Sequence, residues 1–229
     1  MQILSAFRGL HNYTPLESLI YDSLVERAIG ALHERCMSWI EPELRPGLRV
    51  LDVGCGGGQV TLAVAEREPE ARVTGLDLSP EQIERAKGRG ASVGDRVEFV
   101  EGSALDLPFD DGSFDLVYSL GSLKHWSEPA RGLRECARVL TPGGQLIVAE
   151  GDRGCRPADV DAFISTWRVP GPAKVLARLF FVNSLVPLCL DLDDARAAIA
   201  TVPKLDATVE RAEGLPMLVI RGEAQSGGG

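Results

Sequence analysis

The most constraining feature of the chain is a short run in which a buried apolar strand, an acidic residue and alternating glycines precede the start of a helix. The run spans residues 50–61, and its acid and glycines are Asp52, Gly54, Gly56 and Gly58. Glycine is favoured there because the backbone needs φ angles that other residues resist, and because a Cβ would hold a ligand away from the main chain. The run predicts a nucleotide-binding turn; a tight strand–helix turn without a ligand is the alternative.

The spacing of these glycines indicates the ligand. A dinucleotide fingerprint needs glycines at i, i+2 and i+5, and counting from Gly54 the last position is Gln59. The spacing instead resembles motif I of the class I S-adenosylmethionine-dependent methyltransferases. This resemblance implies S-adenosyl-L-methionine as the cofactor and methyl transfer as the reaction. A nicotinamide-dependent oxidoreductase is a rival that Gln59 argues against.

Four later segments resemble successive parts of the same family in the same order. They comprise residues 73–80, 101–109, 113–119 and 135–146, so the resemblance covers roughly residues 47–150. Five ordered segments are far more specific than one glycine loop, which alone has a high false-positive risk.

The expected cofactor contacts follow the ends of successive strands. The glycine loop and the start of its helix offer main-chain N–H groups to the methionine carboxylate, while Asp52 accepts from the ammonium. Asp77 ends the second strand, where a carboxylate can accept from both ribose hydroxyls; a surface acid is the alternative. Where the family often has an adenine-binding acid, this chain has Ser103, for which a generic turn is equally open. The full expected set is Asp52, Gly54, Cys55, Gly56, Gly58, Asp77, Leu78, Ser103, Ala104, Ser119 and Leu120.

The alternation of strands and helices predicts an α/β fold. Strands are expected at 49–53, 72–77, 96–101, 114–119, 144–149, 205–211 and 216–222, with helices at 57–67, 80–88, 128–139 and 192–201. Such alternation implies a doubly wound, mostly parallel sheet of seven strands. The last two strands are joined too tightly for a parallel pair, so the last strand is expected to be antiparallel.

One domain is expected over residues 1–229, with 45% hydrophobic residues to build a single core. Apolar residues at helical spacing predict an N-terminal helical cap within 1–46. The other expected parts are a cofactor-binding core at 47–151, a helical lid insertion at 152–190, a closing helix and strands at 191–223, and a disordered tail at 224–229.

The segment after the fourth strand, residues 118–129, lies where methyl transfer is expected. It lacks the Asn/Asp-Pro-Pro-Tyr/Phe run of enzymes acting on amide or adenine nitrogen, and it resembles methyltransferases that modify quinones, phenols and sterols. His125 is the candidate catalytic base, because its ordinary pKa lies near working pH; a purely structural hydrogen-bonding role is the alternative. Lys124 could attract an anionic acceptor, although a loop lysine is more often solvated.

Further side chains are expected to form the wall of the acceptor site. Glu150 and Asp152 follow the fifth strand and would serve either as wall residues or as simple strand-end caps; two acids without a third ligand do not predict a metal site. Aromatic residues of the lid form either an apolar pocket or shared core. The full set of expected acceptor contacts is Tyr13, Tyr21, Lys124, Trp126, Glu150, Asp152 and Trp167.

Composition limits the partners. A net charge of −9 and a pI near 4.9 disfavour nucleic acid, because binding phosphates would raise the electrostatic energy. Five scattered cysteines without a C-x-x-C pair suggest a reducing cytoplasm, and no apolar stretch is long enough to span a membrane. A small-molecule acceptor is expected, and a homodimer remains open.

The sequence therefore predicts methyl transfer to oxygen or carbon of a small, partly apolar acceptor. The alternative is a protein that binds S-adenosylmethionine without turnover, which Ser103 and the absence of a certain base would favour.

Overall fold

The computed structural model describes residue 32, residues 34–167 and residues 171–225. Of the expected N-terminal cap, the described part is a helical segment over residues 34–40, followed by the 3-10 turn η1 (Glu41–Glu43). The rest of the cap, including Tyr13 and Tyr21, lies outside the described residues, as does the end of the chain from residue 226.

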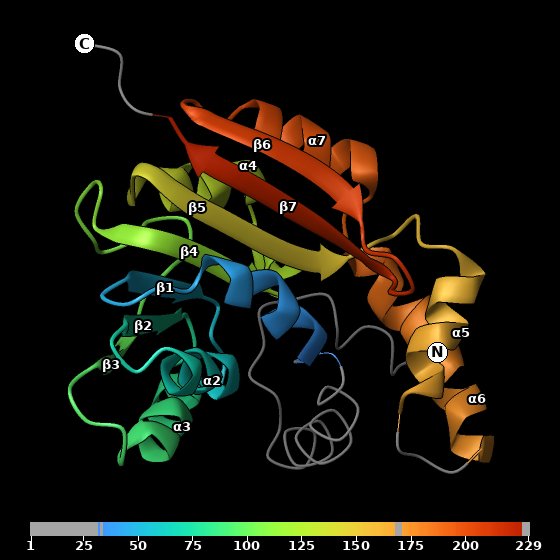
Figure 1. Cartoon of the computed structure of the whole chain (residues 1–229). Helices are drawn as coiled ribbons and strands as arrows, with labels where there is room; N and C mark the ends of the chain where they lie inside the picture. The colour runs from blue at the N-terminus through green and yellow to red at the C-terminus, as the bar shows by residue number, and fades with distance from the viewer. Residues whose placement is uncertain (1–31, 33, 168–170, 226–229) are drawn as a thin grey trace.

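The seven strands form one sheet in the order β3-β2-β1-β4-β5-β7-β6 (Figure 1). The first five strands run parallel, whereas β7 is antiparallel to both β5 and β6. This confirms the predicted fold class with its reversed last strand. The strands are β1 (Arg49–Val53), β2 (Arg72–Asp77), β3 (Val97–Glu101), β4 (Phe114–Leu120), β5 (Leu140–Gly151), β6 (Leu205–Arg211) and β7 (Met217–Ala224).

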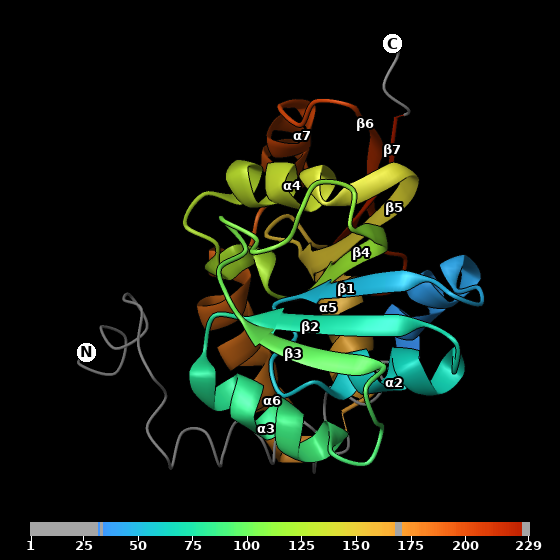
Figure 2. The ribbon, with the colours of Figure 1, turned by 90° about the vertical axis from the view of Figure 1, so that its left-hand side faces the viewer.

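Helices cover both faces of the sheet, and Figure 2 shows α4 and α7 together on one of them. Leu133 of α4 and Ile199 of α7 join a core with Leu51 of β1. On the opposite face, Val64 of α2 joins a core with Val50 of β1. Because β1 is buried on both faces, its sequence is apolar apart from the exposed Arg49 at its start and the buried Asp52. The helices are α2 (Gln59–Arg67), α3 (Pro80–Gly90), α4 (Pro129–Arg138) and α7 (Leu192–Ala200).

Strand β5 begins four residues earlier than its apolar pattern predicts. Leu140 pairs with Phe114, but the next pair is Gln145 with Leu116, so the register shifts between them. Gly143 lies in this irregular part with φ of 78°, a conformation that glycine adopts without steric cost.

The segment between β5 and α7 is helical and lies beyond the end of the sheet toward which β5 points (Figure 1). It contains α5 (Pro157–Ser165), α6 (Gly171–Phe180), the π-helical turn η3 (Phe181–Leu185) and the 3-10 turn η4 (Val186–Leu188). Its two ends are held together where Asp152 forms a bridge with Leu190, and where Arg153 N–H donates to the Leu190 carbonyl at 2.9 Å. Within the described ranges, no helix has the length and apolar content needed to cross a bilayer.

Candidate functional site

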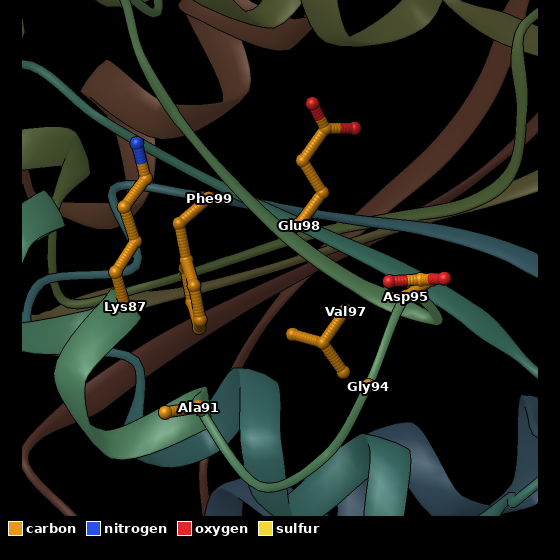
Figure 3. A pocket seen from close by; sticks show the side chains of 8 residues that line it. Lys87, Ala91, Gly94, Asp95, Val97, Glu98 and Phe99 are labelled. Carbon is orange, nitrogen blue, oxygen red and sulfur yellow. The ribbon is translucent and has the colours of Figure 1, made fainter.

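The carboxyl ends of β1, β2, β4 and β5 carry most of the residues that the sequence singled out. Parallel strands bring these ends to one edge of the sheet, which is where α/β folds bind ligands. A separate surface hollow of about 400 Å³ lies at the amino end of β3 (Figure 3). Lys87, Asp95 and Phe99 are among its lining residues, and none of the predicted site residues belongs to it.

The glycine loop after β1 is tied to the neighbouring strand β2 by main-chain hydrogen bonds. Gly54 and Cys55 both donate to the Leu76 carbonyl, at 2.7 and 3.0 Å. Gly56 N–H donates to Oδ2 of Asp77 at 2.8 Å. The loop therefore holds its shape through groups of its own chain, with the Asp77 carboxylate as one of its acceptors.

The three alternating glycines have different reasons to be glycine, although all have positive φ. A Cβ on Gly54 would lie 2.3 Å from Oγ of Ser122, and a Cβ on Gly58 would lie 2.8 Å from the Phe99 ring. A Cβ on Gly56 would meet nothing within 4 Å. Gly54 and Gly58 are thus required by packing, whereas Gly56 leaves open space above the loop.

Asp52 is buried beneath the glycine loop, with 2% of its surface exposed. Its Oδ2 accepts from the Thr61 hydroxyl at 2.7 Å. Burial raises the pKa of Asp52 to about 7, and the Thr61 hydrogen bond opposes this rise. Tyr118, its cross-strand neighbour in β4, is fully buried beside it. Asp52 is therefore enclosed beneath the loop and does not reach the open surface.

Asp77 is the last residue of β2, and Leu78 follows it at the same edge of the sheet. The second carboxylate oxygen of Asp77, Oδ1, accepts from Ser79 N–H at 2.9 Å. Each of its oxygens has capacity for a further donor, because an ionised carboxylate offers about four lone-pair sites. The side chain of Leu78 is 62% exposed.

The predicted residues after β3 and at the end of β4 are held in local contacts. Oγ of Ser103 accepts from Leu105 N–H at 3.1 Å, and Ala104 packs partly against the main core. Ser119 is fully buried, with its hydroxyl 2.8 Å from that of Ser122. Leu120 is partly buried against the core that contains Ala149.

The turn after β4 is joined to the glycine loop by Ser122. Its hydroxyl donates to the Val53 carbonyl at 3.1 Å and occupies the space beside Gly54. Sequence reasoning did not single out Ser122. The only sequence feature that could have indicated it is its position in the turn after a buried strand, four residues before Trp126. Through this contact the predicted cofactor loop and the predicted acceptor segment become neighbours.

His125 ends the 3-10 turn η2 (Leu123–His125) and is exposed. Partial desolvation and then the neighbouring Lys124 ammonium lower its pKa from the ordinary 6.5, while Glu150 and Asp77 act in the opposite direction. The imidazole is therefore mainly neutral at neutral pH and able to accept a proton.

Lys124 and Glu150 face each other across the ends of β4 and β5, with 3.1 Å between Nζ and Oε1. Asp152, two residues after Glu150, turns elsewhere: its Oδ2 accepts from Nε of Arg211 at 2.6 Å and its Oδ1 from Gly154 N–H at 2.7 Å. The structure thus separates two acids that are close in sequence. Within the described part of the chain, no three His, Cys, Asp or Glu side chains come together to hold a metal ion.

The two predicted tryptophans lie in packed surroundings. Trp126 covers Gly132 of α4, where a Cβ would come within 2.3 Å of its ring. Trp167 stacks edge-on against Phe163 with ring centroids 5.5 Å apart. Trp126 therefore contributes to core packing, and Trp167 belongs to the apolar cluster of the helical segment after β5.

The glycine loop fits the S-adenosylmethionine that the sequence resemblance implies. The open face of Gly56 lets a ligand approach the main chain, and the N-cap residue of α2 is Gly58, which has no side chain to cap the first N–H groups of the helix. The Asp77 carboxylate and the exposed side chain of Leu78 lie beside this loop, at the end of β2.

Comparison with known proteins agrees with this arrangement. Residues 51–148 match a family model described as a methyltransferase domain. The chain is 38% identical over 167 residues to 27-O-demethylrifamycin SV methyltransferase of Amycolatopsis mediterranei, which covers 72% of this chain and 59% of that protein. It is 45% identical over 128 residues to the chloroplastic 2-methyl-6-phytyl-1,4-hydroquinone methyltransferase 1 of Oryza sativa, covering 56% and 38%. The chain thus spans less than two thirds of the length of these relatives.

The fold also resembles solved structures. A SAM-dependent methyltransferase from Aquifex aeolicus superimposes with a TM-score of 0.64 at 18% identity, covering 93% of this chain and all of that one. At this identity the likeness concerns the fold.

Proposed function

Because this chain belongs to the class I S-adenosylmethionine-dependent methyltransferase family, we propose that it transfers a methyl group to oxygen or carbon of a small, partly apolar acceptor. The observation that supports this proposal is that Ser122 donates to the Val53 carbonyl and packs against Gly54, so that the turn containing His125 lies next to the glycine loop. The names of the relatives support the acceptor class, since one acts on a hydroquinone and the other on an O-demethylated rifamycin.

On the cofactor side, this chain supplies binding groups in three positions. The N–H groups at the start of α2 bind the carboxylate of the methionine part, and the buried Asp52 attracts its ammonium. Asp77 accepts from the ribose and Leu78 covers the base. When bound, S-adenosylmethionine supplies an electrophilic methyl group on a positively charged sulfur.

On the acceptor side, His125 is proposed as the general base. A neutral imidazole can take the proton that a hydroxyl acceptor loses as its oxygen forms the new bond to carbon. A carbon acceptor would lose its proton to the same group. Holding the two reactants in line and excluding water supplies much of the acceleration, so one base is sufficient.

The apolar side chains beyond β5 support an acceptor with a substantial apolar part. Leu176, Leu179 and Phe180 of α6 are exposed, and this segment lies beyond the carboxyl end of β5 (Figure 1). Pockets for such ligands are lined mainly by apolar and aromatic groups. We propose that this segment closes over the acceptor as a lid.

The experiment that tests the function is turnover to S-adenosylhomocysteine with a panel of phenols, hydroquinones and polyketide alcohols. Methylated product from any member supports the proposal. Tight binding of S-adenosylmethionine by calorimetry together with no product from the whole panel would favour the binding-only alternative.

His125 is tested by His125→Gln, which retains polar character but loses the titratable base. We expect kcat to fall about a hundredfold, the usual contribution of general-base catalysis, and its pH dependence to flatten. Cofactor affinity stays within twofold of the parent. An unchanged pH profile would leave His125 with a structural role.

A further inference from the structure

The carboxylate of Glu150 is the most heavily bonded acid at the functional edge of the sheet. Its Oε2 accepts from Lys124 N–H at 2.9 Å, and its Oε1 accepts from Lys124 Nζ at 3.1 Å and from Gly151 N–H at 2.7 Å. Glu150 is only 3% exposed. Burying a carboxylate so deeply has a large desolvation cost, which pairing with a cation and hydrogen bonds offset here.

Lys124 closes the other side of the same arrangement. Its Nζ also donates to the Gly121 carbonyl, so the lysine side chain links the first residue of the turn to the end of β5. The lysine side chain is 16% exposed, in contrast to the solvated loop lysine that the sequence suggests. One ion pair thus fixes both the main chain and the side chain of the turn that precedes His125.

We propose that Glu150 is a positioning residue for the acceptor: it fixes the turn over residues 121–125 against β5 and cancels the Lys124 charge, so that the site favours uncharged hydroxyl or enol acceptors. This inference rests on the proposed function of the edge. It assigns Glu150 an indirect role, through Lys124 and the placement of His125, rather than a contact with the reacting atoms.

The geometry makes the role of this pair distinguishable from general stability. The charged groups that act on His125 are Lys124 from its own turn, Glu150 from β5 and Asp77 from β2. Removing Glu150 and removing Lys124 should therefore change the pKa of His125 in opposite directions, whereas a loosened turn would give no such pair of opposite shifts.

The test uses Glu150→Gln, Lys124→Met and the double variant, with Asp115→Asn as the matched control. Asp115 lies at the opposite end of β4 and likewise accepts one main-chain N–H and side-chain donors, from Arg49. The readouts are the His125 titration by NMR, kcat and KM for a neutral and a carboxylate-bearing phenol, and cofactor affinity.

Glu150→Gln is expected to lower the His125 pKa and to reduce kcat with the neutral phenol about a hundredfold, as for a small misplacement of reacting groups. It should also raise the relative rate with the carboxylate-bearing phenol, because the Lys124 charge is no longer cancelled. Lys124→Met should raise the His125 pKa, and the double variant should restore it and part of kcat. Asp115→Asn should lower the melting temperature while leaving kcat within twofold.

Shifts of the His125 pKa in the same direction, or kcat within twofold of the parent in Glu150→Gln, would overturn the proposal. If Glu150→Gln does not fold, Glu150→Asp takes its place, since it keeps the charge but is too short for all three hydrogen bonds; undiminished kcat in that variant would overturn the proposal equally. The NMR titration needs no turnover, so it tests the positioning role even if methyl transfer itself is not observed.

Discussion

The cofactor side and the acceptor side of the site are built in different ways. The cofactor side comprises the ends of β1 and β2, from Asp52 to Ser79. Its glycine loop is held mainly by main-chain N–H groups that donate to the Leu76 carbonyl and to the Asp77 carboxylate. The acceptor side depends on side chains from distant segments, such as Lys124 with Glu150 and Asp152 with Arg211. A backbone-built site tolerates little change, whereas a site built from side-chain pairs can change its ligand while the sheet stays the same.

The largest effect is expected at Gly54, where the two sides touch. Gly54→Ala places a Cβ against Ser122 at a φ of 78°, so the clash adds to a backbone strain of about 1–2 kcal/mol. We expect a large fall in the free energy of unfolding and loss of cofactor binding. Thermal melting and calorimetry measure the two effects.

Gly56→Ala and Gly214→Ala separate the effect of backbone strain from an effect on cofactor binding. Both have positive φ, and neither Cβ would meet another atom within 4 Å, so both carry strain alone. Only Gly56 lies in the cofactor loop, and its new methyl group should weaken cofactor binding about tenfold or more by overpacking. Equal cofactor affinity in these two variants would show that the ligand does not approach Gly56.

The next effect is expected at Asp77, on the cofactor side. Asp77→Asn removes the charge that accepts from Gly56 and Ser79, and we expect the cofactor Kd to rise about tenfold to a hundredfold, as for loss of a hydrogen bond to a charged group. The exposed Asp106→Asn serves as the control. A Kd within twofold of the parent would remove Asp77 from the site.

On the acceptor side, Asp152→Ala breaks the bridge to Arg211 and frees the end of the helical segment after β5. Amide hydrogen exchange in residues 157–167 and 171–188 should accelerate about tenfold, because a charge-assisted hydrogen bond that holds the segment is lost. Cofactor affinity should be unchanged. The control is Asp193→Asn in an exposed ion pair, which contributes little. Equal exchange in both variants would contradict a holding role for Asp152.

The contrast between local backbone contacts and distant side-chain contacts also explains which parts of the structure could be predicted from the sequence. Strands β1, β2 and β6 agree with the expected bounds, because each is a short stretch with apolar residues in a strand pattern that lies between Pro or Gly residues, which leaves few alternatives. The reversed β7 follows from a connection too short for a crossover. The glycine loop is likewise local in sequence.

The contacts that the sequence could not supply join distant residues. Ser122 beside Gly54, and Glu150 beneath Lys124, depend on which strand ends meet and on the side-chain rotamers there. Glu150 and Asp152 have the same charge and lie two residues apart, a spacing that would place both side chains on one face of a strand. Strand β5 ends at Gly151, however, so Asp152 lies beyond it and pairs with Arg211, whereas Glu150 pairs with Lys124. The early start of β5 similarly depends on a register shift opposite β4.

The free energy of unfolding should also depend on pH, because of the buried carboxyl of Asp52. Its pKa is about 7 in the folded chain, against 3.8 ordinarily, so between these values the folded state holds a proton that the unfolded state has released. The free energy of unfolding should therefore fall as pH rises, by about 1.4 kcal/mol per pH unit, and level off above about pH 7.

Asp52→Asn removes this titration. The melting temperature of the variant, relative to that of the parent, should therefore rise between pH 5 and pH 7. Thr61→Val should move the parent's levelling point to higher pH, because the Thr61 hydroxyl stabilises the ionised carboxylate. Saturating S-adenosylmethionine should move it to lower pH, since the ammonium favours the same ionised form. If the melting temperatures of the parent and of Asp52→Asn changed with pH in parallel, Asp52 would be ionised throughout this range. The cofactor side would then be held by backbone contacts, and binding would release no proton from Asp52.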